Sequence, residues 1–205
     1  MKRWREKCRV EIDTPRCLLR RLVAEDVDWL TDLIADPEVN HFIDDTVDSP
    51  AQARRYAKAT IELDLDHYQF GYWAIQDKET GSVHGWIALG KLRPYWGPGD
   101  EFALSYVLRR ASWGQGLATE AAGHLVRRAF EEKWLPRIMA LIVVENTASR
   151  RVLEKIGMHA VESPDPLGPD RYQYFRIDAQ TAMSSGPSIP NGSDQGNERR
   201  FTENL

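Results

Sequence analysis

The chain has 205 residues, a formal net charge of -4 and 28% charged residues, so it is long enough to form one domain of ordinary size with its own core. The negative net charge does not indicate a nucleic-acid-binding protein. No stretch is long and apolar enough to cross a bilayer. Its two cysteines imply no disulfide framework, and we therefore expect a reduced, cytoplasmic protein.

The first half of the chain predicts strands and helices with clear end signals. Ser49 as N-cap and Pro50 at the first helical position begin one helix. Residues 78–81 form a hairpin signal between two apolar runs. An earlier helix is expected to end at Asp36-Pro37. The expected strands are 17–22, 70–76 and 83–92, and the expected helices are 25–35 and 50–63.

The second half predicts a strand, a helix, a second strand and a second helix. Apolar residues recur along 117–130 on one helical stripe, whereas 138–144 is a continuous apolar run typical of a strand buried on both faces. Asn146 is a suitable N-cap for a helix over 147–156, and Gly157 suits its C-terminus. We expect strand 102–108 to be parallel to 138–144 through a right-handed crossover. A last strand is expected at 172–177.

The turn between strand 102–108 and helix 117–130 is the most informative feature. Gly114 and Gly116 leave the backbone open where a helix begins, and such a point binds anions, usually phosphate. The alternative is a turn with glycines for steric reasons alone. No Lys-Ser or Lys-Thr pair follows the glycines, so a Walker-type loop is not indicated. Thr119 stands where a dinucleotide fingerprint needs its third glycine.

Three separated segments, occurring in the right order, are similar to one family. Residues 113–121 (Trp-Gly-Gln-Gly-Leu-Ala-Thr-Glu-Ala) resemble the acetyl-CoA pyrophosphate loop of the GNAT N-acetyltransferase superfamily. Residues 146–158 resemble its second cofactor-contacting helix, and residues 14–22 resemble the first strand of the branch with the ribosomal-protein N-terminal acetyltransferases. The resemblance implies a mixed α/β sheet with splayed central parallel strands flanked by helices. We expect an extension at 1–13, the acetyltransferase domain at 14–180 and a disordered tail at 181–205.

The resemblance also implies how acetyl-CoA is held. The pyrophosphate would lie on the loop and the first turn of its helix, and the pantetheine arm would pair with the backbone of the preceding strand. Asn146 would hold the pantetheine or act only as an N-cap. Arg109 would face phosphate or end a solvated strand, and Arg150 would bind the 3′-phosphate or remain an exposed charge. The expected cofactor-binding residues are Tyr106, Val107, Leu108, Arg109, Gln115, Gly116, Leu117, Ala118, Thr119, Asn146 and Arg150.

The expected catalytic residues are Glu101 and Ser149. Relatives often carry a glutamate where this chain has Ala103, and Glu101 shares that strand face. Glu101 is therefore a candidate base, or a solvated carboxylate at the strand edge. The family's frequent tyrosine acid falls on Leu153. Ser149 matches the serine that takes this part in the N-terminal acetyltransferase branch, or is only a small polar residue in a first helical turn.

The expected function is transfer of acetyl from acetyl-CoA to a primary amine in a ternary complex. Deprotonating a lysine amine near pH 7 costs roughly 4–5 kcal/mol, whereas deprotonating an α-amine costs roughly 1–1.4 kcal/mol. A protein N-terminus therefore suits a site with a doubtful base. A small cationic amine is the other expected acceptor, because carboxylates flank helix 50–63 (Asp44, Asp45, Asp48, Glu62, Asp64 and Asp66).

Ala103 and Leu153 leave open an alternative, a catalytically idle acyl-CoA-binding regulatory module. We expect acceptor entry over residues 42–48 and the loop 93–98, because long aromatic loops at strand ends form ligand walls. Neither a nucleic acid nor a membrane partner is expected, and a homodimer is left open. The histidines have no metal-ligand spacing, so no metal is expected.

Overall fold

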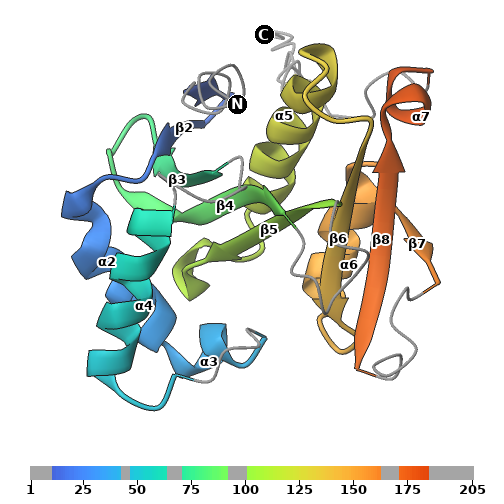
Figure 1. Cartoon of the computed structure of the whole chain (residues 1–205). Coiled ribbons are helices and arrows are strands. Elements are labelled where there is room, and N and C mark those ends of the chain that lie inside the picture. Colours follow the sequence, from blue (N-terminus) through green and yellow to red (C-terminus); the bar gives the residue numbers. More distant parts are fainter. Residues whose placement is uncertain (1–10, 43–46, 64–70, 92–100, 163–170, 185–205) are drawn as a thin grey trace, which may run out of the picture.

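The computed structural model describes residues 11–42, 47–63, 71–91, 101–162 and 171–184. They form an eight-stranded mixed sheet in the order β1-β2-β3-β4-β5-β6-β8-β7, with helices on both faces (Figure 1). The strands are β1 (Ile12–Asp13), β2 (Cys17–Arg21), β3 (Gly71–Asp77), β4 (Val83–Lys91), β5 (Phe102–Leu108), β6 (Arg137–Val143), β7 (His159–Val161) and β8 (Tyr172–Asp178). The helices are η1 (Ala24–Asp26), α2 (Val27–Ala35), α3 (Pro37–Asn40), α4 (Pro50–Leu63), η3 (Arg110–Ser112), α5 (Leu117–Glu131), α6 (Thr147–Lys155) and α7 (Ala179–Ser184).

The predicted capping residues act as expected. Ser49 Oγ accepts a hydrogen bond from the backbone N–H of Gln52 at 3.2 Å, and α4 begins at Pro50. The side chain of Asn146 caps α6 by accepting from the N–H of Ser149 at 3.0 Å. Gly157 follows α6 with a φ of +87°, the left-handed conformation predicted for it. The long elements therefore lie within one or two residues of their predicted ranges.

The chain ends of the described fold differ from the expected domain limits. Ile12 and Asp13, expected in an extension, pair with β2 as β1. Residues 181–184, expected in a disordered tail, complete α7, which begins where the N–H of Ala179 donates to the Pro136 carbonyl at 2.9 Å. Residues 1–10 and the remaining tail, 185–205, lie outside the described residues. The short elements β1, α3, β7 and α7 were not predicted, because each has too few residues to show a periodic pattern.

β5 and β6 are the parallel pair at the centre of the sheet, as predicted, and they diverge. Their register is held at one position, Ala103 opposite Met139, whereas β5 pairs with β4 along its whole length. In Figure 1, β5 lies against β6 where it begins and moves away from it toward its end. This is the splay that the family resemblance implied.

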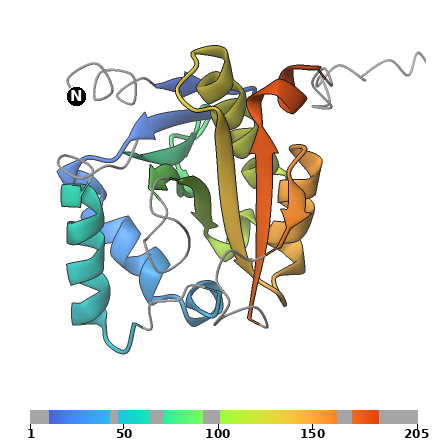
Figure 2. The same ribbon diagram turned by 45° about the vertical axis from the view of Figure 1, so that its right-hand side comes forward.

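Two cores lie on opposite faces of the sheet half that contains β2 to β5. Leu104 and Leu108 of β5 face the core beneath α5 and α6, while Val107 packs against the core beneath α2 and α4. This alternation follows the two-residue period of a strand. Figure 2 shows α2 and α4 together, apart from α6 and β7. Among the helices that the structure describes, none has the length and apolar character needed to span a membrane.

Candidate functional site

A cavity of about 610 Å³ occupies the gap between β5 and β6 and joins the two faces of the sheet. Its cofactor-side wall consists of the loop before α5, the first turn of that helix, β6 and α6. Its other wall comes from α2, α3, α4 and β4. The strand that separates the two walls is β5, from which Leu104, Ser105, Tyr106, Val107 and Leu108 all line the cavity.

The loop before α5 has the geometry of an anion site. Gly114 and Gly116 have φ values of +73° and +76°, and Gly116 is the left-handed N-cap of α5. A Cβ at position 114 would meet nothing within 4 Å, so the backbone there is open to a ligand. The first N–H groups of a helix have no partner within the helix and carry its positive end. The loop therefore presents several donors to one anionic group.

An ion-pair network holds this loop to the first long strand. The Glu120 carboxylate, on the first turn of α5, accepts from Thr14 Oγ1 at 2.7 Å, from the Arg16 backbone N–H at 2.8 Å and from Arg16 Nε at 2.7 Å. Arg16 Nη1 also donates to the Gln115 carbonyl at 2.9 Å. Burial raises the pKa of Glu120, but the hydrogen bonds from Thr14 and Arg16 outweigh it and hold that pKa below its usual value. The network fixes where the loop carbonyl points.

A second network holds the other end of the loop to the β3–β4 hairpin. Ser112 Oγ lies 2.8 Å from His84 Nδ1, and His84 Nε2 lies 3.4 Å from the Asp77 carboxylate. Hydrogen bonds from Thr80, supplemented by His84, lower the pKa of Asp77 to about 2. The next residue, Trp113, donates from Nε1 to the Leu108 carbonyl at 2.8 Å. The loop is therefore fixed at both ends, as a preorganised phosphate site requires.

Most of the predicted cofactor-binding residues come together around the cavity. Asn146 lines it while its side-chain oxygen caps α6, so the predicted N-cap role is observed. Ser149 lines it one turn further along α6. Besides these two, the predicted residues in the cavity wall are Tyr106, Val107, Leu108, Gly116, Leu117, Ala118 and Thr119.

The two arginines predicted as phosphate contacts, Arg109 and Arg150, have other neighbours in the structure. Arg109 Nη2 is 3.5 Å from the Trp29 carbonyl on α2, and the neighbouring Arg110 forms an ion pair with Glu38 on α3. The Arg150 guanidinium lies 5.8 Å from the centre of the Phe175 ring. Gln115 was expected to offer its backbone N–H to phosphate, and its side chain donates from Nε2 to the Ala111 carbonyl at 2.7 Å. The predicted residues Arg109, Gln115 and Arg150 are not part of the cavity wall described here.

Glu101 lies at the closed end of the gap between β5 and β6. It precedes β5, and its carboxylate is 3.7 Å from Arg137 Nη1 at the start of β6. Ser105, which does line the cavity, is four residues further along, roughly 13 Å at the rise of a strand. The structure therefore does not bring Glu101 into the described cavity wall.

Sequence reasoning missed three features of the site. Arg151 and Lys155 of α6 line the cavity, and their spacing of four residues is the signal that could have placed both on one helical face. The hydroxyl of Tyr106 donates to the Ser149 carbonyl at 3.2 Å, and burial raises the pKa of this tyrosine to about 12. Side chains of Tyr56 and Trp86 line the opposite wall. In the part of the chain that the structure describes, no cluster of side chains is suited to a metal ion.

Comparisons with known proteins agree with this geometry. A family model described as an acetyltransferase (GNAT) domain matches residues 16–159. The chain is 32% identical over 144 residues to the uncharacterized N-acetyltransferase p20 of Bacillus licheniformis, covering 70% of this chain and 79% of that protein. The crystal structure of the acetyltransferase from Agrobacterium tumefaciens str. C58 matches with a TM-score of 0.66 and 27% identity, over 82% of this chain and 94% of that one. The ribosomal L7/L12 alpha-N-protein acetyltransferase in complex with coenzyme A shares the fold, with a TM-score of 0.65 and 16% identity over 82% and 98% of the two chains.

The glycine loop generates the first testable prediction. In Gly116→Val, the side chain occupies the space beside the loop backbone, and we expect the affinity for coenzyme A to fall about tenfold or more by calorimetry. The matched control is Gly81→Val in the β3–β4 hairpin, where φ is +72° and the nearest atom to a new Cβ is Gln76 Nε2 at 3.8 Å. Both variants carry similar backbone strain, so an equal loss of affinity in the two would contradict a cofactor contact at Gly116.

The network around Glu120 generates the second prediction. Glu120→Gln places an amide where Arg16 Nε now meets a carboxylate, so the contact with the Gln115 carbonyl weakens and the loop is less well held. Because Arg16 is half exposed, we expect only about a fivefold loss of affinity for coenzyme A. Glu131→Gln, at the other end of α5, removes the exposed ion pair with Arg127 and serves as the control. Identical calorimetric affinities in Glu120→Gln and in the parent would show that the network does not organise the loop.

Proposed function

We propose that this chain, which belongs to the GNAT acetyltransferase family, transfers the acetyl group of acetyl-CoA to a primary amine. The transfer takes place in a ternary complex. The family's members use acetyl-CoA as cosubstrate. The observation that carries the amine proposal is the continuous cavity, which joins the anion-binding loop to the face beneath α2 and α4 through the gap beside β5. Cofactor and acceptor can therefore approach one carbonyl from opposite sides. No feature of the described site favours the idle binding module.

The unpaired edge of β5 supports the proposed position of the pantetheine arm. Beyond Ala103, β5 has no register with β6, so the backbone edge of Tyr106 to Leu108 faces the gap rather than a strand. Buried backbone groups require partners, and the amides of an extended ligand can supply them in the manner of an added strand. Arg151 and Lys155 lie on the adjoining wall and are suited to the anionic parts of the cofactor.

In the proposed reaction, the neutral amine nitrogen attacks the thioester carbonyl carbon, the C–S bond breaks, and the sulfur leaves with its electron pair as a thiolate. The amine gives up one proton to water, and the thiolate gains one. Ser149 is our candidate donor of that proton, and the partly buried hydroxyl of Tyr106 donates to the backbone carbonyl of the same residue. Because a thiol pKa is about 8.5, the thiolate is a tolerable leaving group and the donor contributes only part of the rate.

Water rather than Glu101 is our preferred acceptor of the amine proton. The carboxylate of Glu101 is engaged with Arg137 at the closed end of the gap. An α-amine with a pKa of about 7.7–8.0 is neutral often enough near pH 7 that no strong base is required. This reasoning favours acceptors with amines of low pKa, including protein N-termini.

The third prediction separates the two hydroxyls. We expect kcat to fall roughly tenfold in Ser149→Ala while the Kd for coenzyme A changes little, because the hydroxyl is needed mainly in the transition state. Tyr106→Phe, measured in parallel, tests whether the buried hydroxyl shares that role. Thr147→Ala removes an exposed hydroxyl from the same helix and is expected to keep the parent rate. A full rate in Ser149→Ala, by release of the free coenzyme A thiol, would leave Ser149 as a helix residue only.

The fourth prediction concerns Glu101. If water accepts the amine proton, the pH–rate profile of Glu101→Gln overlays that of the parent from about pH 6 to about pH 9, the range in which an α-amine titrates. If Glu101 were the base, the rate of Glu101→Gln would fall furthest below the parent rate at low pH, where the amine is charged. The difference between the two rates would shrink as the pH rises. Steady-state rates over this range with one amine decide between the two outcomes.

A further inference from the structure

We propose that the amine acceptor carries an aromatic or branched aliphatic group close to its reactive nitrogen, and that Trp86 and Tyr56 select for it. This inference rests on the proposed amine acetylation and names the class of acceptor. It concerns the wall of the cavity that faces α2 and α4, which the cofactor does not occupy in our proposal. The shared chemistry fits two sources, a small arylalkylamine and the N-terminal residue of a peptide.

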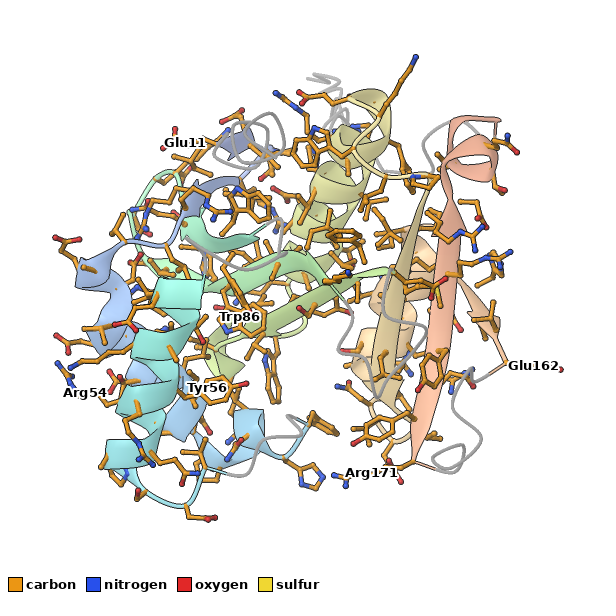
Figure 3. The ribbon with its side chains drawn as sticks, in the orientation of Figure 1. Glu11, Arg54, Tyr56, Trp86, Glu162 and Arg171 are labelled. Carbon is orange, nitrogen blue, oxygen red and sulfur yellow. The ribbon has the colours of Figure 1, made fainter. Side chains whose placement is uncertain are left out.

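The wall is built mostly from apolar and aromatic side chains of α2, α3, α4 and β4, together with Val107 of β5. Trp86 of β4 lies opposite Val107 of β5 in the sheet register, and both side chains face α2 and α4. Tyr56 of α4 lies across from Trp86, and the two are shown together on that side of the sheet in Figure 3. The rest of this wall is formed by Ile34, Val39, Phe42, Val47 and Thr60.

The position of this wall determines how near the apolar group must be to the amine. Val107 and Ser105 project toward α2 and α4 from the same strand whose other face meets the cofactor side. Trp86 is the direct cross-strand neighbour of Val107, about 5 Å away at strand spacing. Trp86 and the β5 residues at the gap line the same cavity. An acceptor whose amine lies at the gap can therefore extend its first carbon atoms past Val107 toward the indole.

The charges in the described wall oppose a polycationic acceptor. Among the residues that the structure describes, the ionic side chains that line the cavity are Arg151 and Lys155, both on the cofactor side. Asp48 and Glu62, two of the carboxylates expected to attract a polycation, are exposed and are not part of the described wall. Asp44, Asp45, Asp64 and Asp66 lie outside the described residues. A second ammonium group would be desolvated where it packs against Trp86 and Tyr56. Among the described residues of the wall, no carboxylate would form an ion pair with it.

The experiment compares the turnover of different primary amines by the release of free coenzyme A thiol. The panel contains 2-phenylethylamine, isoamylamine and spermidine, together with otherwise identical peptides that begin with Phe or with Asp. The small amines are alkylamines that resemble lysine in pKa, so they are compared with one another at one pH of about 9, where more of each is neutral. We expect kcat/KM for 2-phenylethylamine to exceed that for spermidine roughly tenfold or more. The peptide pair shows whether the preferred source is a protein N-terminus or a small amine. Faster turnover of spermidine would overturn this inference and leave amine acetylation standing, whereas turnover of no amine would overturn the proposed function as well.

Substitutions in this wall test whether its residues determine which amine acceptor is preferred. Trp86→Ala is expected to reduce the preference for 2-phenylethylamine roughly tenfold, with the affinity for coenzyme A unchanged. Val47→Glu places a carboxylate at the wall and is expected to raise the relative rate with spermidine, and it does not remove core volume. Tyr72→Leu is the matched control, because Tyr72 packs edge-on against Trp86 at 5.2 Å but does not line the described cavity. Unchanged amine preference in both Trp86→Ala and Val47→Glu would overturn the assignment.

Discussion

The divergence of β5 from β6 is the constraint on which the rest of the site depends. A parallel pair in the middle of a sheet would normally be closed by hydrogen bonds along its length. Here the register is held at Ala103 and Met139, and the strands then separate. The outer neighbours stay fully paired, since β4 follows β5 and β8 follows β6 along whole strands. Two stiff half-sheets are therefore joined at one end, and a ligand can supply the missing strand at the other.

Holding that opening in shape requires contacts distant in sequence. Thr14 and Arg16, which both precede β2, reach Glu120 on α5, and Arg16 also reaches the carbonyl of Gln115. Ser112 is held through His84 from the opposite direction. The loop thus has little conformational freedom left to lose when an anion binds, and a site that is ordered in advance binds at a lower entropic cost. The same contacts that complete the fold also prepare the cofactor site.

The sequence predicted the backbone of the site better than its side chains. α5 was predictable from Gly116 at its start and from its long apolar stripe, and α6 from its N-cap Asn146 and from Gly157 after it. Side chains at strand ends were not, because their direction depends on distant partners. Arg109 turns toward the Trp29 carbonyl and Arg150 toward the Phe175 ring, and neither contact has a local signal. The role of Tyr106 was predicted for its backbone alone, because nothing in the sequence indicated that its hydroxyl meets Ser149 on another element.

Leu153 stands where the family resemblance implies a tyrosine acid, and in this structure the residue has a different role. The family's frequent tyrosine would stand there, but Leu153 is fully buried and completes the core beneath α6. A hydroxyl nevertheless reaches the same helix from the strand opposite, because Tyr106 projects from β5 onto the Ser149 carbonyl. Transfer to a neutral amine with a thiol leaving group makes modest demands on acid and base groups. Because little acid or base catalysis is required, the wall beneath α2 and α4 can be apolar. An acceptor that arrives as a neutral amine needs no carboxylate to pair with it.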